Sequence, residues 1–212
     1  SAGAGEPVSA APPAVPTEAS TTEYSQAVKD LNVFLEYKAV RRKAGGGVYV
    51  LPDLSNLRLW HGVIFLRQGM YRGGIFKFSI ILPHNYPEDG AVPTVHFSSR
   101  VFHPRVNYES GALDVSAKFS KWISRKHQAS SVVRYIKEIF YLKSYDVEGA
   151  LNTRAVEMWR RDQEDFRRAV EECVALSVDK ATAKDTTTGS IVLTEPKAAH
   201  AAIRQAVVEE GA

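Results

Sequence analysis

The sequence predicts an α+β domain in which an N-terminal helix precedes a four-stranded antiparallel meander and C-terminal helices follow it. Three observations lead to this prediction. Apolar residues recur at helical spacing near the start, the spacing shortens to roughly two between Val48 and Phe97, and helical spacing returns from Val132 onwards. The 212 residues suit one domain of ordinary size with flanking segments.

Residues 1–21 are rich in Ala, Pro, Gly and Ser and hold few large apolar side chains. Such a segment cannot bury enough surface to offset the entropy lost on ordering, so we predict that it is disordered. From Thr22 the pattern becomes that of an amphipathic helix. Its predicted apolar face consists of Tyr24, Ala27, Val28, Leu31, Phe34 and Leu35, and we expect the helix to end before Gly45.

The middle of the chain alternates apolar with other residues, as in Phe76, Phe78 and Ile80, and turn residues at Gly73–Gly74 and Pro83 interrupt it. This pattern indicates antiparallel strands joined in order. Helical spacing then returns in two sets of residues, which predict two helices after the sheet. The sets are Val132, Val133, Ile136, Ile139 and Phe140, then Ala155, Trp159, Phe166, Val170 and Cys173.

The folded domain is predicted to span residues 22–180. Residues 181–212 form a small, polar linker followed by a weak helix that has Pro196 in its first turn and the apolar residues Ile203, Val207 and Val208 further on.

Composition excludes several classes of function. With 27 basic and 24 acidic residues the net charge is only +3, which does not favour a nucleic-acid binder. The only cysteine, Cys173, allows neither an intramolecular disulfide nor a thiolate zinc cluster, and a reducing, cytoplasmic setting is expected. The six histidines lack metal-ligand spacing, so no cofactor is implied.

No apolar run approaches the ~20 residues that span a bilayer, so no direct membrane insertion is expected. The start lacks the order of a signal peptide. Because the chain begins at Ser1 without a methionine, we expect a processed or trimmed form.

Five short blocks follow one another in a fixed order. They are Trp60 with the strand HGVIFLRQG, YRGGIF at 71–76, LPHNYP at 82–87, VFHP at 101–104, and ALN at 150–152 with Asp162 and Phe166 beyond it. In this order they resemble the ubiquitin-conjugating (UBC) fold over roughly residues 22–178. The blocks have structural roles, so they indicate the fold and not an activity.

The resemblance implies a catalytic cysteine after the His-Pro block, preceded by a glycine and followed eight residues later by a tryptophan. The matching stretch is GALDVSAKFSKW, in which Trp122 lies eight residues after Asp114. Asp114 therefore occupies the cysteine position. A competing alignment puts Ala112 there, but it breaks the tryptophan spacing and also supplies no thiol. Arg105 stands where the family has an asparagine that helps to stabilise the oxyanion.

A carboxylate cannot carry ubiquitin as a reactive thioester, so we predict that the chain is not an enzyme and has no catalytic residue. Cys173 falls on the apolar stripe of a helix and is predicted to be a core residue. His103 is expected to be architectural. Asp114 with Lys118 or Lys121 is expected to form a solvated charge pair.

Within the inactive variants the chain is most similar to the fused-toes (AKTIP) family. The resemblance rests on the strand GVIFLRQG leading into YRGGIFKF, on Ser-Gly-x-Leu-Asp-Val at 110–115, and on the lysine before Trp122. It implies a non-catalytic adaptor that binds Hook coiled-coil proteins and an FHIP subunit and links vesicles or endosomes to dynein-based transport on microtubules.

We expect the partner surface to be the exposed side of the Val101–Trp122 region together with the tail residues Ile203, Val207 and Val208. Alternatively, the tail is disordered or packs back on its own domain. Two other functions stay open. One is a ubiquitin-binding variant that assists an active conjugating enzyme; the other is an enzyme of unrecognised chemistry, for which no nucleophile, metal cluster or phosphate loop stands out.

Overall fold

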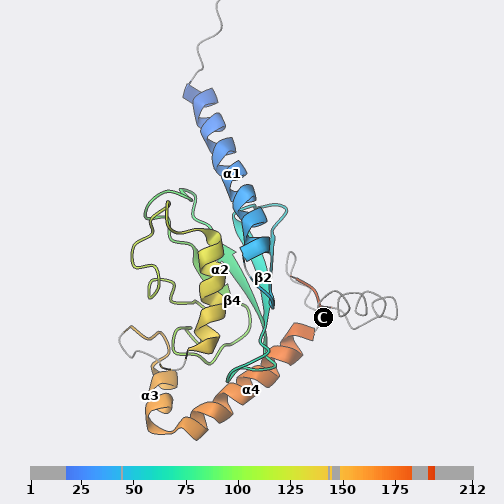
Figure 1. The fold of residues 1–212 in the computed structure, drawn as a ribbon, viewed down its shortest axis with the longest axis vertical. Helices are drawn as coiled ribbons and strands as arrows, with labels where there is room; N and C mark the ends of the chain where they lie inside the picture. Colours follow the sequence, from blue (N-terminus) through green and yellow to red (C-terminus); the bar gives the residue numbers. More distant parts are fainter. Residues whose placement is uncertain (1–17, 44, 143, 145–148, 183–190, 194–212) are drawn as a thin grey trace, which may run out of the picture.

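The computed structural model describes residues 18–43, 45–142, 144, 149–182 and 191–193. It has the predicted α+β architecture, in which helix α1 precedes a four-stranded antiparallel sheet of order β1-β2-β3-β4 and the remaining helices follow (Figure 1). The elements are α1 Glu18–Lys43, β1 Val48–Pro52, β2 Leu59–Phe65, β3 Ile75–Ile81, β4 Thr94–Phe97, α2 Ala129–Glu138, η1 Ile139–Tyr141, α3 Thr153–Arg161 and α4 Gln163–Thr182.

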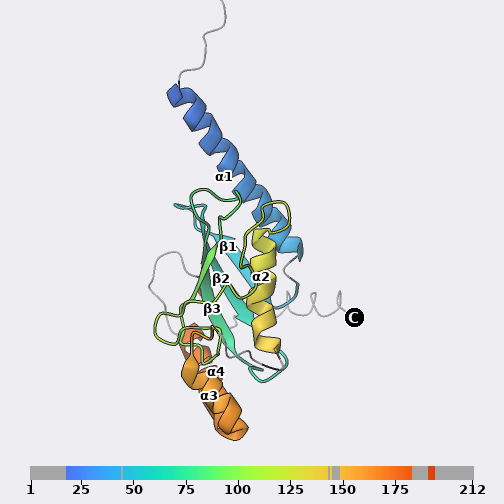
Figure 2. The same cartoon turned by 90° about the vertical axis from the view of Figure 1, so that its left-hand side faces the viewer.

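The inner face of the sheet holds the main core, and α2 lies across it (Figure 2). The predicted alternation along β3 is confirmed, because Phe76, Phe78 and Ile80 are all buried on this face. Phe76 stacks on Phe140 of η1 with ring centres 5.2 Å apart, and the Tyr71 ring meets Phe140 edge to face. Aromatic packing of this kind fixes the sheet against the turn that follows α2.

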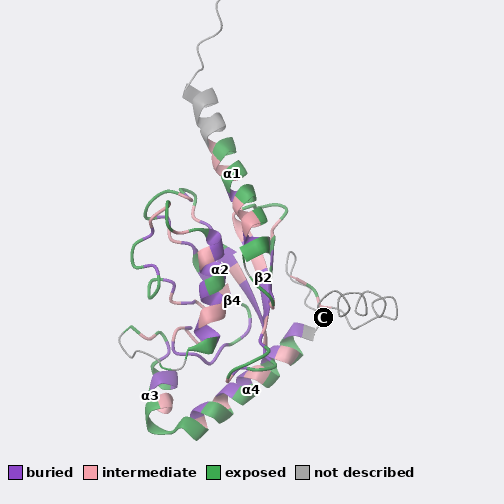
Figure 3. Cartoon of the chain, in the orientation of Figure 1, coloured by how far each residue is buried: buried purple, intermediate pink, exposed green. Residues whose placement is uncertain are grey.

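Helix α1 ends before Gly45, as predicted, but the predicted apolar face is wrong. Val28, Leu31, Phe34 and Leu35 are exposed. Figure 3 shows exposed residues at intervals along α1. The side facing the domain carries Val33, Tyr37 and Val40 between polar residues.

Polar contacts hold α1 in this orientation. Lys29 pairs with Glu88 at 2.9 Å, and Asp30 pairs with Arg58 at 3.0 Å. Glu36 accepts hydrogen bonds from the Tyr86 hydroxyl and from the Ala129 amide at the start of α2. The sequence carries apolar residues on both sides of the helix, and spacing alone could not tell which side meets the sheet.

The first predicted C-terminal helix corresponds to α2 with η1, and all five of its predicted apolar residues are buried. The second is wrong as a single helix, because it is split into α3 and α4 at Asp162. The backbone of Asp162 is extended, and its Oδ1 accepts hydrogen bonds from the amides of Glu164 and Asp165. An aspartate in this position caps a new helix, so the chain turns between Arg161 and Gln163.

A glycine fixes the segment that packs beside β4. Gly111 has φ +71°, and its carbonyl accepts a hydrogen bond from the Phe97 amide at 2.8 Å. It lies so close to Phe97 that an added Cβ would overlap the Phe97 carbonyl oxygen. Gly90 has a similar φ of +82° but has open space around it.

We expect Gly111→Ala to lower the free energy of unfolding by about 2–4 kcal/mol, because it combines an unfavourable positive φ with a backbone overlap. Gly90→Ala is the matched control and should cost only about 1–2 kcal/mol, the contribution of positive φ alone. Urea denaturation of both variants measures the difference. Equal losses would show that the close approach to Phe97 does not constrain this segment.

Candidate functional site

The loop that follows β4 is anchored by His103, whose side chain is completely buried. Its Nδ1 accepts a hydrogen bond from the Arg105 amide at 2.9 Å, so the proton lies on Nε2, which donates to the Ile139 carbonyl at 3.0 Å. Burial, reinforced by the positive charge of Arg105, lowers the pKa of His103 to about 4. His103 is therefore a neutral core residue, in keeping with the architectural role expected for it.

Asn152 ties this loop to α3. Its side-chain oxygen accepts a hydrogen bond from the Ala155 amide and caps the helix, while its backbone amide donates to the Pro104 carbonyl at 3.2 Å. The VFHP and ALN blocks, which are far apart in the sequence, are thus joined in the structure.

Arg105 and Asp114, the two positions that the resemblance assigns to the asparagine and the cysteine, form an ion pair. Nη1 of Arg105 lies 3.3 Å from Oδ2 of Asp114, and the two side chains are only 15% and 11% exposed. The backbones are joined as well, since the Asp114 amide donates to the Arg105 carbonyl at 2.8 Å. The structure therefore brings the two predicted positions together.

The remaining contacts of Asp114 hold its carboxylate in place. Oδ1 accepts hydrogen bonds from the Ser116 hydroxyl at 2.6 Å and from the Ala117 amide at 3.1 Å. Tyr135 of α2 donates its hydroxyl to the Asp114 carbonyl at 3.0 Å. The expected solvated pair of Asp114 with Lys118 or Lys121 is wrong, because Asp114 is largely buried against Arg105. Lys118 instead pairs with Glu138 at 3.2 Å.

Cys173 is unsuited to nucleophilic chemistry. It lies on α4, is buried, and its sulfur accepts a hydrogen bond from the Phe102 amide at 3.3 Å. Burial raises the pKa of the thiol to about 11, so the reactive thiolate is scarce at neutral pH. Cys173 is the only cysteine in the sequence and is a core residue, as predicted.

Metal binding and membrane spanning find little support in the part of the chain that the structure describes. Within these residues, no three His, Cys, Asp or Glu side chains are grouped so that they could hold a metal ion. The described helices also include none with the length and apolar character needed to cross a bilayer.

A candidate partner surface that the sequence did not reveal lies on α1. We call Val28, Leu31, Phe34 and Leu35 the α1 stripe. These residues repeat at spacings of three and four, so they share one side of the helix, and each is exposed. Lys38 lies beside them with its Nζ 5.2 Å from the centre of the Phe34 ring. The predicted tail residues Ile203, Val207 and Val208 lie outside the described residues.

The predicted partner surface at Val101–Trp122 has a different character. Its apolar side chains, among them Val106, Val115 and Phe119, are buried, whereas Lys118, Ser120 and Lys121 are exposed. Its solvent side is therefore polar.

Comparison with known proteins agrees with the fold and with the ordered blocks. The family model for ubiquitin-conjugating enzyme matches residues 32–174. The chain belongs to the ubiquitin-conjugating enzyme family. Within that family its relatives are AKT-interacting (fused-toes) and crossbronx proteins, and it is a member of this group.

Three relatives illustrate the similarity. A protein crossbronx homolog of Culex quinquefasciatus is 38% identical over 156 residues, covering 72% of this chain and 68% of the relative. A protein AKTIP homolog of Nematostella vectensis is 40% identical and covers 68% and 48%. The human AKT-interacting protein is 35% identical and covers 80% and 57%. The chain thus spans between about half and two thirds of the length of these relatives.

The ion pair generates a first prediction for this site. Replacing Arg105 with alanine removes the guanidinium from a carboxylate that is largely shielded from water. We expect the free energy of unfolding to fall by about 1–3 kcal/mol in urea denaturation. Arg100→Ala is the control, since Arg100 is 67% exposed and lies 4.0 Å from Glu109; its loss should stay below about 1 kcal/mol. A loss as large for Arg100 as for Arg105 would contradict the proposed contribution of the pair.

His103 gives a second prediction for this site. The folded state keeps the ring neutral down to its pKa of about 4, whereas the unfolded chain takes up a proton below about 6.5. The unfolded state therefore binds more protons between these values, and stability is lost as the pH falls through this window. We expect a loss of about 3 kcal/mol from this group between pH 7 and pH 4.

Histidine ring signals in a proton NMR titration check this directly. The His103 signal should not titrate between pH 7.5 and pH 5.5. A midpoint near 6.5 would show that the ring is accessible to solvent and that its buried hydrogen bonds are not maintained.

Proposed function

We propose that this chain is a non-catalytic member of the ubiquitin-conjugating family and acts as an adaptor that binds protein partners. One observation carries the proposal: Arg105 and Asp114 join in an ion pair at the positions that would hold the catalytic asparagine and cysteine. A guanidinium-paired carboxylate offers no thiol for a thioester, and the one cysteine is buried elsewhere.

The α1 stripe supports a protein-binding role. Soluble domains rarely turn an apolar helix face towards water without a use for it, and apolar residues at spacings of three and four suit packing against another helix. The stripe belongs to a helix whose opposite side is already fixed to the domain through Asp30, Glu36 and Val33. It is thus both exposed and rigidly presented, which lowers the entropic cost of binding.

We further propose, from the resemblance to fused-toes proteins, that the partners are a Hook-type coiled-coil protein and an FHIP-type subunit. In this function the chain is cytoplasmic and peripheral on vesicles or endosomes, and it connects them to dynein on microtubules. A coiled coil presents a helix with an apolar seam, which is the chemistry that the α1 stripe matches. The tail residues Ile203, Val207 and Val208 are proposed as a second contact.

Leu31→Asp tests the stripe. An aspartate in the middle of the stripe places a charge in the proposed interface, and we expect affinity for a purified Hook-type coiled-coil region to fall at least about tenfold, which corresponds to 1.4 kcal/mol. The matched control is Leu176→Asp on α4, because Leu31 and Leu176 are both 56% exposed. Isothermal titration calorimetry with the full chain gives both affinities, and circular dichroism confirms that both variants fold.

Unchanged binding by Leu31→Asp would exclude the stripe as the contact. A full chain that does not bind the coiled coil at all, but binds ubiquitin and stimulates an active conjugating enzyme, would instead support the ubiquitin-binding variant. The third possibility is an enzyme of unrecognised chemistry. Incubation with ubiquitin-activating enzyme, ubiquitin and ATP tests it, since any covalent adduct on this chain would contradict a non-catalytic role.

A further inference from the structure

The outer face of the sheet is apolar where β1 and β2 pair. Tyr49 and Leu51 of β1 project to this side and are more than half exposed, and Tyr49 is paired in register with Val63 of β2. The Tyr49 ring also meets the Phe65 ring edge to face, with centres 5.9 Å apart. Val63 is 1% exposed although it lies on the side of β2 opposite the main core. Something other than the core therefore covers it.

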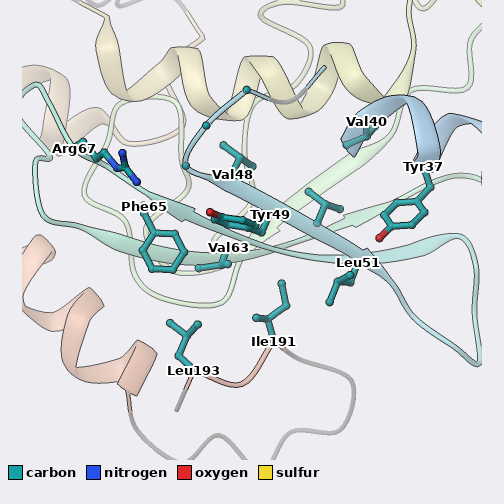
Figure 4. A pocket seen from close by; sticks show the side chains of 14 residues that line it. Tyr37, Val40, Val48, Tyr49, Leu51, Val63, Phe65, Arg67, Ile191 and Leu193 are labelled. Carbon is teal, nitrogen blue, oxygen red and sulfur yellow. The ribbon is translucent and has the colours of Figure 1, made fainter. Parts of the chain in front are cut away.

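The C-terminal part of the chain lies on this side of the sheet. α4 crosses the neighbouring strand β3, where Ser177 accepts a hydrogen bond from the Ile75 amide at 3.1 Å. Beyond α4, the described residues Ile191–Leu193 return over β1 and β2. In Figure 4 the side chains of Ile191 and Leu193 point towards Val63, Phe65 and Leu51. Two segments of one chain thus share the outer face.

Residues 191–193 alternate in the way expected of an extended segment lying on a surface. Ile191 and Leu193 are half-buried and line the groove, whereas Val192 between them is 58% exposed. The groove has a volume of about 1080 Å³, and Tyr37 and Val40 of α1 close one end of it while Arg67 lies at the other.

We propose that the outer face of β1 and β2 is a docking site for this chain's own C-terminal segment, with Ile191 and Leu193 as its two anchors. While the segment is docked, Ile191 and Leu193 cover part of the face, and an apolar segment of another protein must compete with them for it. This inference does not depend on which partners the chain binds elsewhere.

Physical considerations favour this occupant over a separate molecule. Residues 183–190 connect the end of α4 to Ile191, and eight residues can extend over about 26 Å. A tether this short gives an effective local concentration on the order of millimolar, so two apolar anchors need only weak intrinsic affinity to stay docked. A second copy or a partner must compete with that concentration.

The test uses the full chain with Ile191→Asp, Leu193→Asp and, as matched control, Val192→Asp. Each variant adds the same charge, but only the first two place it against the sheet. We expect Ile191→Asp and Leu193→Asp to shift the NMR signals of Val63, Tyr49 and Phe65 and to raise the fluorescence of a hydrophobic dye at least about twofold, and Val192→Asp to do neither. The changes should be independent of protein concentration, because the contact is intramolecular.

A second measurement separates docking from a general loss of structure. A chain ending at Thr182 keeps α4 complete, and a synthetic peptide of residues 187–197, added at a concentration on the order of millimolar to match the tether, should restore the Val63 signal towards its position in the full chain. Adding the same peptide to the full chain should have little effect.

Unchanged Val63 signals in both anchor variants would overturn the proposal. Signals that depend on protein concentration in the full chain would also overturn it, because they would show that a second copy covers the face.

Discussion

The sheet has apolar residues on both faces, and water must be kept from each of them. On the inner face this is done by α2, η1 and the aromatic side chains between them, with Phe76 stacked on Phe140 as the central contact. On the outer face α4 covers β3, and Ile191–Leu193 lie over β1 and β2. Both segments on the outer face, α4 and Ile191–Leu193, come from the chain after α3.

The loop between β4 and α2 is held by buried contacts of His103, Gly111 and the Arg105–Asp114 pair. His103 is buried and hydrogen-bonded to the backbone on both sides, and Gly111 allows the close approach to Phe97. Arg105 and Asp114 compensate each other, because either charge alone in this partly buried place would be costly. The ion pair therefore holds Arg105 and Asp114 together within the loop.

Two apolar surfaces are prominent in the structure, the α1 stripe and the groove over β1 and β2. The α1 stripe is open and presented by a helix fixed through its polar side, which suits binding to another protein. The groove over β1 and β2 is lined in part by the chain's own Ile191 and Leu193. In the proposed function, an adaptor with one free apolar surface and a second one partly covered by its own chain has fewer partners competing for it, because specificity depends as much on excluding wrong contacts as on making the right ones.

Much of this could be predicted from the sequence. Alternation along β3, the helical spacing of Val132–Phe140 and the ordered blocks from Trp60 to Asn152 determined the fold class and the family, because periodicity and turn residues report local structure directly. The sequence also shows that there is one cysteine. It places Asp114 and Arg105 at the positions that the resemblance assigns to the cysteine and the asparagine, since these assignments depend on residue identity and spacing alone. The break at Asp162 was missed although an aspartate before Gln-Glu-Asp is a capping signal.

Only the tertiary structure decided which surfaces are free. α1 carries apolar residues on two sides, and its orientation is set by Asp30 with Arg58 and by Glu36 with Tyr86, contacts between residues far apart in the sequence. In the same way, the pairing of Asp114 with Arg105 and not with Lys118, and the return of Ile191–Leu193 to β1 and β2, depend on how distant segments meet. Sequence spacing describes what lies along one element, whereas burial and charge pairing depend on its neighbours in space.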